Sequence, residues 1–340
     1  MSIFKAHTPT FKDIKGKNLK NSIAEMQMVP LGDTRQSVII RGEDRRNPVL
    51  LLVHGGAAET PLFRYYNSEL EKNFVVVYWD QRGCGKSYTK RDANVPLNIQ
   101  MYVQDLCDLA IYLKKYLGKE KIYLLAHSWG SLLGILAVSQ HPELFIAYVG
   151  TGQVSSMPES GLISYQFTLR SAKEQKNEKA IHELTAIREP QNGVYTSGIK
   201  GNRIQDKWLD YFGGVIYGSK SIGMFISRYF TSPEYNFVDI IRFFKSLNTP
   251  ARSKLLYGEF LKTDLFKTIK KVEIPVYFFH GRHDYQVASV VTEKFFHEIM
   301  APKKELIWFE QSAHCACFEE AEKFNSLMVN MVLNTTTSNL

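Results

Sequence analysis

The chain has 340 residues, of which 44% are hydrophobic and 22% charged, and its formal net charge is +8; this balance is typical of a globular protein and excludes a disordered chain. Its basic residues are spread in ones and twos without interleaved aromatic residues, which indicates a solvated surface rather than a nucleic-acid partner. The apolar runs are too short to span a bilayer, so we expect no membrane segment. Residues 1–20 lack the apolar core of a secretory signal, and the four cysteines do not form a disulfide framework in a chain of this length. We therefore expect a cytoplasmic protein.

Two apolar, β-branched runs open the predicted sheet. They are Gln36–Arg41 and Pro48–Val53, and the turn-rich residues between them predict a hairpin. Phe74–Trp79 is the next predicted strand. Residues 98–117 then show the spacing of a helix with one apolar face, and Gly118 is typical of a helix end.

In the rest of the sheet region, strands and helices alternate. The predicted elements are a strand at Ile122–Leu125, a helix at Ser131–Gln140, and strands at Phe145–Val149, Pro275–Phe279 and Glu305–Phe309, the last two flanking a helix at Val287–Ile299. The strands are continuous apolar runs, which is typical of parallel strands that are buried on both faces. We therefore predict an α/β fold with a mostly parallel sheet covered by helices on both faces.

Between about residue 155 and residue 271 helical stretches replace the strand-like runs. The predicted helices are Leu162–Lys176, Lys179–Ile187, Arg203–Tyr217, Ser221–Phe230 and Phe237–Leu247. Most of the many aromatic residues in this region are expected to pack inside a helical unit. We predict a sheet domain made of residues 1–154 and 272–340, with residues 155–271 inserted between two strands as a helical lid over the carboxyl edge of the sheet.

A serine lies at a sharp turn between a strand and a helix. The sequence Ala126-His127-Ser128-Trp129-Gly130 matches Gly-x-Ser-x-Gly, with alanine in place of the first glycine. Small residues two before and two after the serine let the strand and the helix approach closely, so the hydroxyl group is held exposed at the carboxyl edge of the sheet. Ser128 is therefore the predicted nucleophile.

An activated serine needs a histidine base and a carboxylate that orients the base, and after such a turn the acid precedes the histidine in the chain. Asp284 and His314 each follow a predicted strand, so both side chains should reach the edge at which the serine emerges. We predict the triad Ser128, Asp284 and His314. Glu310 is the alternative acid, and the weaker candidates for the base are His127, His280 and His283.

Two backbone N–H groups are needed to bind the oxyanion of the tetrahedral intermediate. Trp129, directly after the nucleophile, is one predicted donor. The sequence His54-Gly55-Gly56 follows the strand Pro48–Val53, and its glycines allow the backbone to approach a substrate carbonyl. Gly56 is the predicted second donor.

Two other motifs favour structural roles. Residues 80–87 end in Gly-Lys-Ser like a phosphate-binding loop, but Asp80 stands where that motif needs its first glycine, so we expect a structural loop tied by Asp80 and Arg82. The sequence His314-Cys315-Ala316-Cys317 lacks the spacing of a zinc site, and its cysteines are expected to be buried at the start of the last helix. We expect no metal and no cofactor.

Together these motifs resemble the α/β-hydrolase superfamily and, within it, the prolyl aminopeptidase (proline iminopeptidase) family of serine peptidases. The resemblance rests on His54-Gly55-Gly56, on Asp80–Ser87, and on His127-Ser128-Trp129-Gly130-Ser131 followed by His141-Pro142-Glu143, and it covers both parts of the sheet domain. It implies an α/β-hydrolase fold with an inserted helical lid. The chain departs from the family at Ala57-Ala58, where the family has Pro-Gly, and at Ala126-His127, where it has Gly-Gly.

The resemblance implies a serine aminopeptidase that releases an N-terminal residue, such as proline, from short peptides. Family members recognise the free α-amino group with lid glutamates, but the sequence singles out no glutamate here. A carboxylesterase for small apolar esters would use the same machinery, and a binding protein without catalysis is a third hypothesis. A lid favours a small peptide, or another small amide or ester, as the substrate. The oligomeric state stays open.

Overall fold

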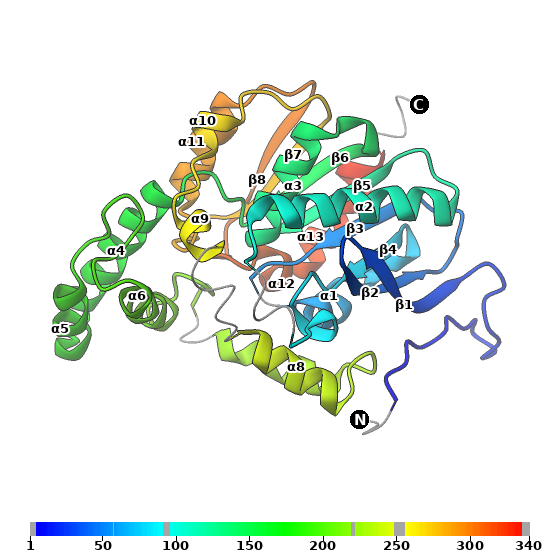
Figure 1. The fold of residues 1–340 in the computed structure, drawn as a ribbon, viewed down its shortest axis with the longest axis horizontal. Helices are drawn as coiled ribbons and strands as arrows, with labels where there is room; N and C mark the ends of the chain where they lie inside the picture. Colours follow the sequence, from blue (N-terminus) through cyan, green and yellow to red (C-terminus); the bar gives the residue numbers. More distant parts are fainter. Residues whose placement is uncertain (1–4, 57, 91–95, 219–221, 248–255, 335–340) are drawn as a thin grey trace.

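The computed structural model describes residues 5–56, 58–90, 96–218, 222–247 and 256–334. Within them one eight-stranded sheet has the spatial order β1-β2-β4-β3-β5-β6-β7-β8 (Figure 1). The strands are β1 (Ile23–Leu31), β2 (Thr34–Gly42), β3 (Val49–Val53), β4 (Val75–Trp79), β5 (Ile122–His127), β6 (Phe145–Thr151), β7 (Val276–Gly281) and β8 (Lys304–Phe309). β3 to β8 are parallel, whereas β1 and β2 pair antiparallel with their neighbours. The predicted α/β fold with a mostly parallel sheet is confirmed.

The predicted hairpin between the first two apolar runs is wrong. β2 instead pairs with β1, through a tight turn at Gly32 and Asp33, and β4 lies between β2 and β3. Gly32 has a φ of +55°, a conformation that favours glycine. The sequence does not reveal β1 because it is an edge strand, in which Glu25, Gln27 and other half-exposed residues interrupt the apolar pattern.

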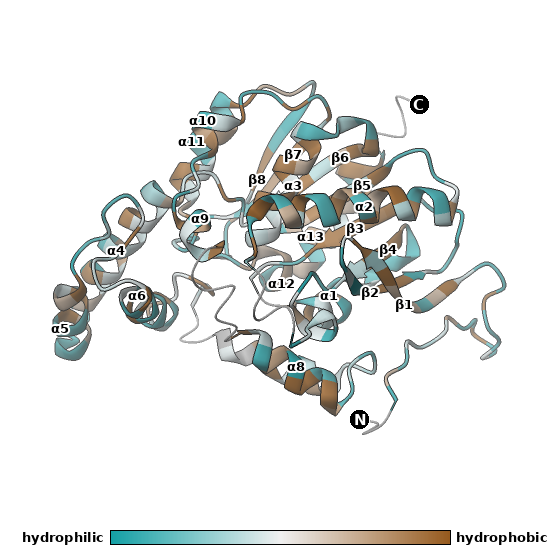
Figure 2. Ribbon diagram, viewed as in Figure 1, coloured by the Kyte–Doolittle hydropathy of each residue, from teal (hydrophilic) through white to brown (hydrophobic). Residues whose placement is uncertain are grey.

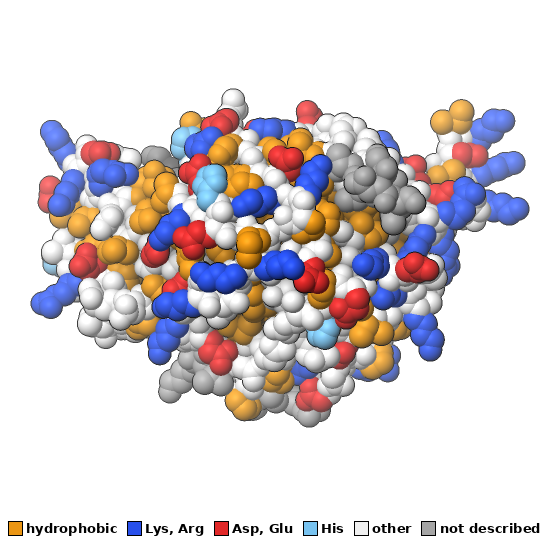
Figure 3. All heavy atoms as spheres, turned by 90° about the horizontal axis from the view of Figure 1, so that it is seen from above, with side chains coloured by type: hydrophobic (Ala, Val, Ile, Leu, Met, Phe, Trp, Pro, Cys, Tyr) orange, Lys and Arg blue, Asp and Glu red, His pale blue; other side chains and the backbone are white. Residues whose placement is uncertain are grey.

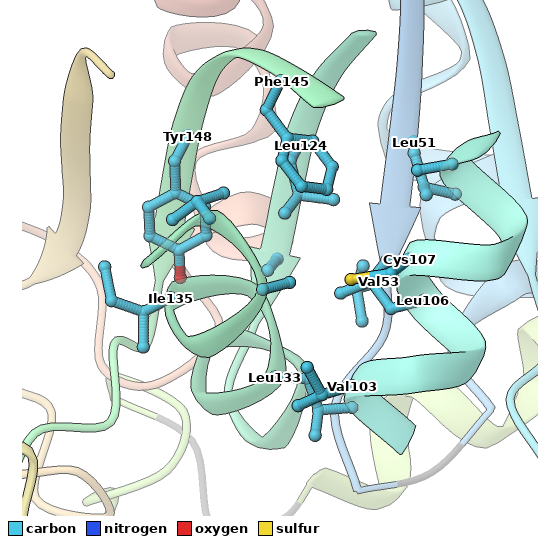
Figure 4. Close-up of a cluster of buried hydrophobic side chains, with 14 of the residues drawn as sticks. Leu51, Val53, Val103, Leu106, Cys107, Leu124, Leu133, Ile135, Phe145 and Tyr148 are labelled. Carbon is cyan, nitrogen blue, oxygen red and sulfur yellow. The ribbon is translucent and has the colours of Figure 1, made fainter. Parts of the chain in front are cut away.

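Each central strand sends alternate side chains to opposite faces of the sheet, and both faces are covered. Leu51 and Val53 join the apolar cluster beneath α2 (Ile99–Leu117) and α3 (Trp129–Gln140), part of which Figure 4 shows. Leu50 and Leu52 join the cluster on the other face. That face is covered by α1 (Thr60–Tyr66), α12 (Ala316–Glu319) and α13 (Ala321–Leu327). Figure 2 shows the resulting hydrophobic interior between helices with hydrophilic outer faces.

The predicted helices of the sheet domain are confirmed with small shifts at their ends. α2 begins where the Asn98 side chain accepts the Met101 N–H at 2.9 Å, and it ends at Gly118, whose φ is +65°. The helix between β7 and β8 is α11 (Ser289–Glu298). The remaining elements are the 3₁₀ helices η1 (Ser68–Lys72), η2 (Gly85–Ser87) and η3 (Pro142–Leu144), and the π-helical segment η6 (Met328–Leu333).

The described residues between β6 and β7 form helices joined by turns and single bridges. The helices are α4 (Met157–Glu174), α5 (Glu178–Ile187), α6 (Ile199–Tyr211), the 3₁₀ helix η4 (Ile222–Phe225), α7 (Ile226–Thr231), α8 (Phe237–Leu247), α9 (Tyr257–Leu261) and α10 (Leu265–Thr268). Ser221, with which one predicted helix begins, lies outside the described residues. The two ends of the segment are joined, because the Met157 N–H donates to the Thr263 carbonyl at 2.9 Å and the Leu265 N–H to the Ser155 carbonyl at 2.7 Å.

This helical segment packs in two parts. α4, α5 and α6 enclose a separate apolar cluster that contains Tyr165, Leu184 and Trp208. α7 contacts α1 and adds Tyr229 to a cluster of the sheet domain, and α8 contacts η2. The predicted helix 203–217 ends earlier, at Tyr211. The residues that follow it run instead along the loops after β7 and β8.

None of the helices in the described ranges has the length and apolar character needed to cross a bilayer. On the face that Figure 3 shows, lysine and arginine side chains alternate with acidic and apolar ones. The positive net charge is therefore dispersed over this face rather than gathered into a stripe.

Gly130 provides a test of the close packing behind the serine turn. A Cβ atom at this position would lie 2.3 Å from the Val53 carbonyl oxygen and 2.5 Å from that of His54, and neither backbone atom can move away. We expect Gly130→Ala to lower the free energy of unfolding by about 3 kcal/mol or more, measured by urea denaturation. Gly161→Ala is the matched control in α4, because its Cβ would come no closer than 3.9 Å to a neighbour. Equal stability of the two variants would contradict the prediction.

Candidate active site

Ser128 occupies a strained turn between β5 and α3. Its φ of +53° and ψ of −121° are unusual for a residue with a side chain. The Ser128 N–H donates to the Thr151 carbonyl at the end of β6, at 2.9 Å, and the residue is partly exposed. The turn therefore presents the hydroxyl group at the carboxyl edge of the sheet.

The structure brings Ser128, His314 and Asp284 together in one hydrogen-bonded row. His314 Nε2 lies 2.8 Å from Ser128 Oγ, and His314 Nδ1 lies 2.8 Å from Asp284 Oδ2. With the ring proton on Nδ1, the imidazole donates to the carboxylate and accepts the serine hydroxyl proton. This arrangement can abstract a proton from Ser128 and stabilise the imidazolium that results.

Asp284 is completely buried and held by its own turn. Its Oδ1 accepts the N–H groups of Gln286 and Val287, each at 2.9 Å. Burial raises the pKa of Asp284, but the charge and hydrogen bond of His314 outweigh it and hold the pKa below its usual value. The carboxylate is therefore ionised at neutral pH.

Glu310, His283 and His280 are not members of this row. Glu310 forms an exposed ion pair with Arg282 at 2.8 Å, and the His283 ring stacks on Tyr217 with 4.2 Å between ring centroids. His280 contacts the acid from its other side, since its Nε2 lies 3.4 Å from Asp284 Oδ2. This contact between His280 and Asp284 is absent from the sequence-based prediction.

The loop that carries His314 is fixed by Glu319, a residue that the sequence analysis missed. Glu319 Oε1 accepts the N–H groups of Ala313 and Cys315, each at 3.0 Å, on either side of the histidine. Its Oε2 accepts the Tyr217 N–H at 2.7 Å, and the His314 N–H donates to the Val215 carbonyl at 2.9 Å. The histidine loop is therefore joined to residues 215–217 of the helical segment.

The two predicted oxyanion donors belong to loops that lie close together, since Trp129 directly follows Ser128 and a Cβ atom on Gly55, the neighbour of Gly56, would lie 3.2 Å from His127 Nδ1. Trp129 is the first residue of α3, so its N–H has no acceptor within the helix. Gly56 is exposed and directly follows the buried His54 and Gly55. Gln81 joins the two loops, because its side-chain amide donates to the His54 carbonyl at 2.7 Å and accepts the Trp129 indole N–H at 2.9 Å.

The loop of residues 80–87 is tied into the protein, as predicted. Arg82 is buried and forms two hydrogen bonds to Asp105, at 2.8 and 2.9 Å. Asp80 accepts the Lys86 N–H at 2.8 Å and the Tyr235 hydroxyl at 2.5 Å. These hydrogen bonds fix the loop to the rest of the protein, which is a structural role.

No group of three potential metal ligands is found among the residues that the structure describes. Cys315 and Cys317 lie at the start of α12, buried as predicted. Burial raises the pKa of both thiols well above the usual value, so they stay protonated.

Comparison with known proteins identifies the fold family. The sequence profile of the α/β hydrolase fold family matches residues 48–321. A protein of Bacillus subtilis named probable aminopeptidase YbaC is 31% identical over 314 residues, which cover 90% of this chain and 95% of the relative. A proline iminopeptidase of Saccharolobus solfataricus is 21% identical and covers 84% of each chain. The crystal structure of the Mycobacterium smegmatis proline iminopeptidase superimposes with a TM-score of 0.66 at 16% identity, over 93% of this chain and 100% of that one.

The pKa of Glu319 predicts how pH affects stability. Burial raises this pKa to about 7 from a usual value of 4.5, even though three N–H groups favour the carboxylate. Between these pH values the folded protein binds more protons than the unfolded chain, so stability falls as pH rises. The quantity to compare is the free energy of unfolding of the parent minus that of Glu319→Gln. We expect this difference to fall by about 3 kcal/mol from pH 4.5 to pH 8.

Urea denaturation at a series of pH values measures this difference. Glu322→Gln, at an exposed position of α13, is the control and should show no such pH dependence. A parent-minus-variant difference that stays constant with pH would contradict the raised pKa.

Proposed function

The chain belongs to the α/β-hydrolase fold family, and we propose that it is a serine hydrolase that acts as an aminopeptidase on short peptides. The observation that supports this proposal most directly is the row Asp284–His314–Ser128, with 2.8 Å at both steps. We assign Gly56 and Trp129 as the oxyanion donors and residues 155–271 as the lid. The cytoplasmic location expected from the sequence is part of the same proposal.

The proposed reaction has two halves. His314 Nε2 accepts the proton of Ser128 as Oγ attacks the substrate carbonyl, and Asp284 stabilises the imidazolium. The two backbone N–H groups bind the oxyanion, after which His314 donates the proton to the leaving amine and an acyl-enzyme remains. In the second half His314 takes a proton from water, the hydroxide attacks the acyl carbonyl, and Ser128 regains its proton as the acid product leaves.

The aminopeptidase assignment draws on the names of the relatives and on an unpaired carboxylate. Asp206 lies on α6, four residues after Asn202, whose amide donates to the Tyr257 hydroxyl at 2.6 Å. Residues four apart share a helix face, so Asp206 faces α9. Phe260 of α9 in turn packs against Trp129, with 5.7 Å between ring centroids, beside the nucleophile.

Asp206 has the properties expected of a group that binds a cation. It is exposed on α6, and desolvation by the surrounding protein raises its pKa to about 6. No charge or hydrogen bond among the described residues compensates this desolvation. A substrate ammonium would supply the missing counter-charge, and we propose Asp206 as its partner.

Asp284→Asn tests the proposed mechanism. The amide would favour the wrong tautomer of His314, so we expect kcat to fall by about 10⁴ with little change in KM. Ser128→Ala should abolish turnover, and Glu310→Gln should leave it unchanged because Glu310 contacts Arg282 rather than the histidine. A damaging Glu310→Gln together with a harmless Asp284→Asn would assign the acid to Glu310 instead.

Substrate class is tested by comparing kcat/KM for a prolyl arylamide, its N-acetyl form and a short acyl ester. An aminopeptidase should cleave the free amine far faster than the N-acetyl form, because acetylation removes the charge that pairs with the carboxylate. Asp206→Asn should raise KM for the free amine by about tenfold to hundredfold. It should leave ester hydrolysis unchanged.

Glu174→Gln, at an exposed position of the lid, is the matched control for Asp206→Asn. Equal rates on the two amides, or activity confined to the ester, would replace the aminopeptidase by a carboxylesterase. Failure of a fluorophosphonate to label Ser128, with no turnover of any of the three substrates, would favour the non-catalytic binding protein.

A further inference from the structure

A buried carboxylate and a histidine connect the three loops of the candidate active site. Glu59 Oε2 accepts the Gly55 N–H at 2.7 Å and lies 2.9 Å from His127 Nδ1. The Nε2 of His127 lies 3.1 Å from the backbone carbonyl oxygen of His314. Because His127 directly precedes Ser128, these contacts join the glycine loop after β3, the serine turn and the histidine loop.

The hydrogen-bond partners determine the protonation state of His127. A carbonyl oxygen can only accept, so Nε2 carries a proton; an ionised carboxylate can also only accept, so Nδ1 carries one too. With Glu59 ionised, His127 is therefore an imidazolium paired with its carboxylate. The opposed pKa shifts agree with this: burial alone would lower the pKa of His127 and raise that of Glu59, but their mutual attraction reverses both.

Stability alone does not account for such a pair. The side chains of His127 and Glu59 are only 1% and 12% exposed, and the desolvation of two buried ions offsets most or all of their attraction. The pair also occurs where the chain departs from the family motifs, which have glycine in place of His127. A glycine there would leave Glu59 without a cationic partner and would disconnect the three loops.

We propose that Glu59 and His127 are positioning residues that hold the oxyanion loop, the nucleophile and the catalytic histidine in their relative places. The inference rests on the proposed function, and neither residue contacts the reacting atoms in it. The Glu59 carboxylate fixes the backbone one residue before the oxyanion donor Gly56. The His127 ring fixes the backbone of His314, whose side chain must stay in line with Ser128 Oγ. A displacement of about 1 Å at such a site lowers the rate about 100-fold.

The test compares variants that break the connection with one that preserves it. We expect Glu59→Ala and His127→Ala each to lower kcat about 100-fold with little change in KM, and the double variant to be no worse than either single one. Glu59→Gln should retain most of the activity, because its amide can accept the Gly55 N–H and donate to a neutral His127. Glu71→Gln is the matched control, since Glu71 is a buried carboxylate paired with Arg41 and Arg64, and Arg41 lies opposite Val76 at the start of β4, the end of the strand away from the candidate site. It should lower Tm without changing kcat/KM of the folded protein.

Histidine NMR gives a readout that does not depend on turnover. At pH 8 both ring nitrogens of His127 should be protonated in the parent, and only one in Glu59→Gln. If the parent protein hydrolysed none of the substrates, the proposed function would be refuted. The NMR signals of the His127 ring would still show whether Glu59 and His127 form an ion pair. A neutral His127 in the parent, or folded alanine variants with the kcat of the parent, would overturn this inference. An effect of Glu59→Ala on Tm alone, as for Glu71→Gln, would overturn it as well.

Discussion

The candidate active site depends on the meeting of parallel strand ends at one edge of the sheet. β3, β5, β7 and β8 all point the same way, so the glycine loop, the serine turn, the acid loop and the histidine loop emerge side by side. The turn at Ser128 needs a φ of +53°, a strain on the order of 1–3 kcal/mol that the surrounding structure must hold in place. α3 and β6 do so from two sides, through the close approach at Gly130 and the hydrogen bond to Thr151.

This constraint explains why sequence reasoning could identify Ser128, Asp284 and His314 as one group. Each residue lies a short way past an apolar run, and the ends of parallel strands share one edge, so chain order was enough to predict proximity. The central strands and α2 could be predicted for a related reason. Their apolar patterns and the caps at Asn98 and Gly118 agree with the tertiary structure, so local and global preferences coincide.

The features that sequence reasoning missed have different physical causes. Glu319 and Glu59 act as acceptors for backbone N–H groups, and a backbone partner leaves no trace in residue spacing. The hairpin was predicted wrongly because β2 could not be assigned a partner without knowledge of the polar edge strand β1. The helix expected to reach Tyr217 stops at Tyr211 for a local reason, because Gly213 takes a φ of +79° and the Gly213 and Gly214 N–H groups donate to the Asp210 and Leu209 carbonyls at 3.1 and 2.9 Å. The glycine pair at 213 and 214 is therefore a stop signal that the predicted helix 203–217 overran.

The contacts of residues 214–217 limit how a lid could move. The Gly214 carbonyl accepts the Tyr285 N–H at 3.1 Å, the Val215 carbonyl accepts the His314 N–H at 2.9 Å, and the Tyr217 N–H donates to Glu319. If this stretch moved, the loops of both Asp284 and His314 would lose backbone partners, and the row Asp284–His314–Ser128 would lose its alignment. α4, α5 and α6 have an apolar cluster of their own, but Phe167 of α4 stacks on Tyr285, next to Asp284, with 3.7 Å between ring centroids. A movement of these helices about a hinge that precedes Gly214 would therefore break this stack but keep the backbone hydrogen bonds of the Asp284 and His314 loops.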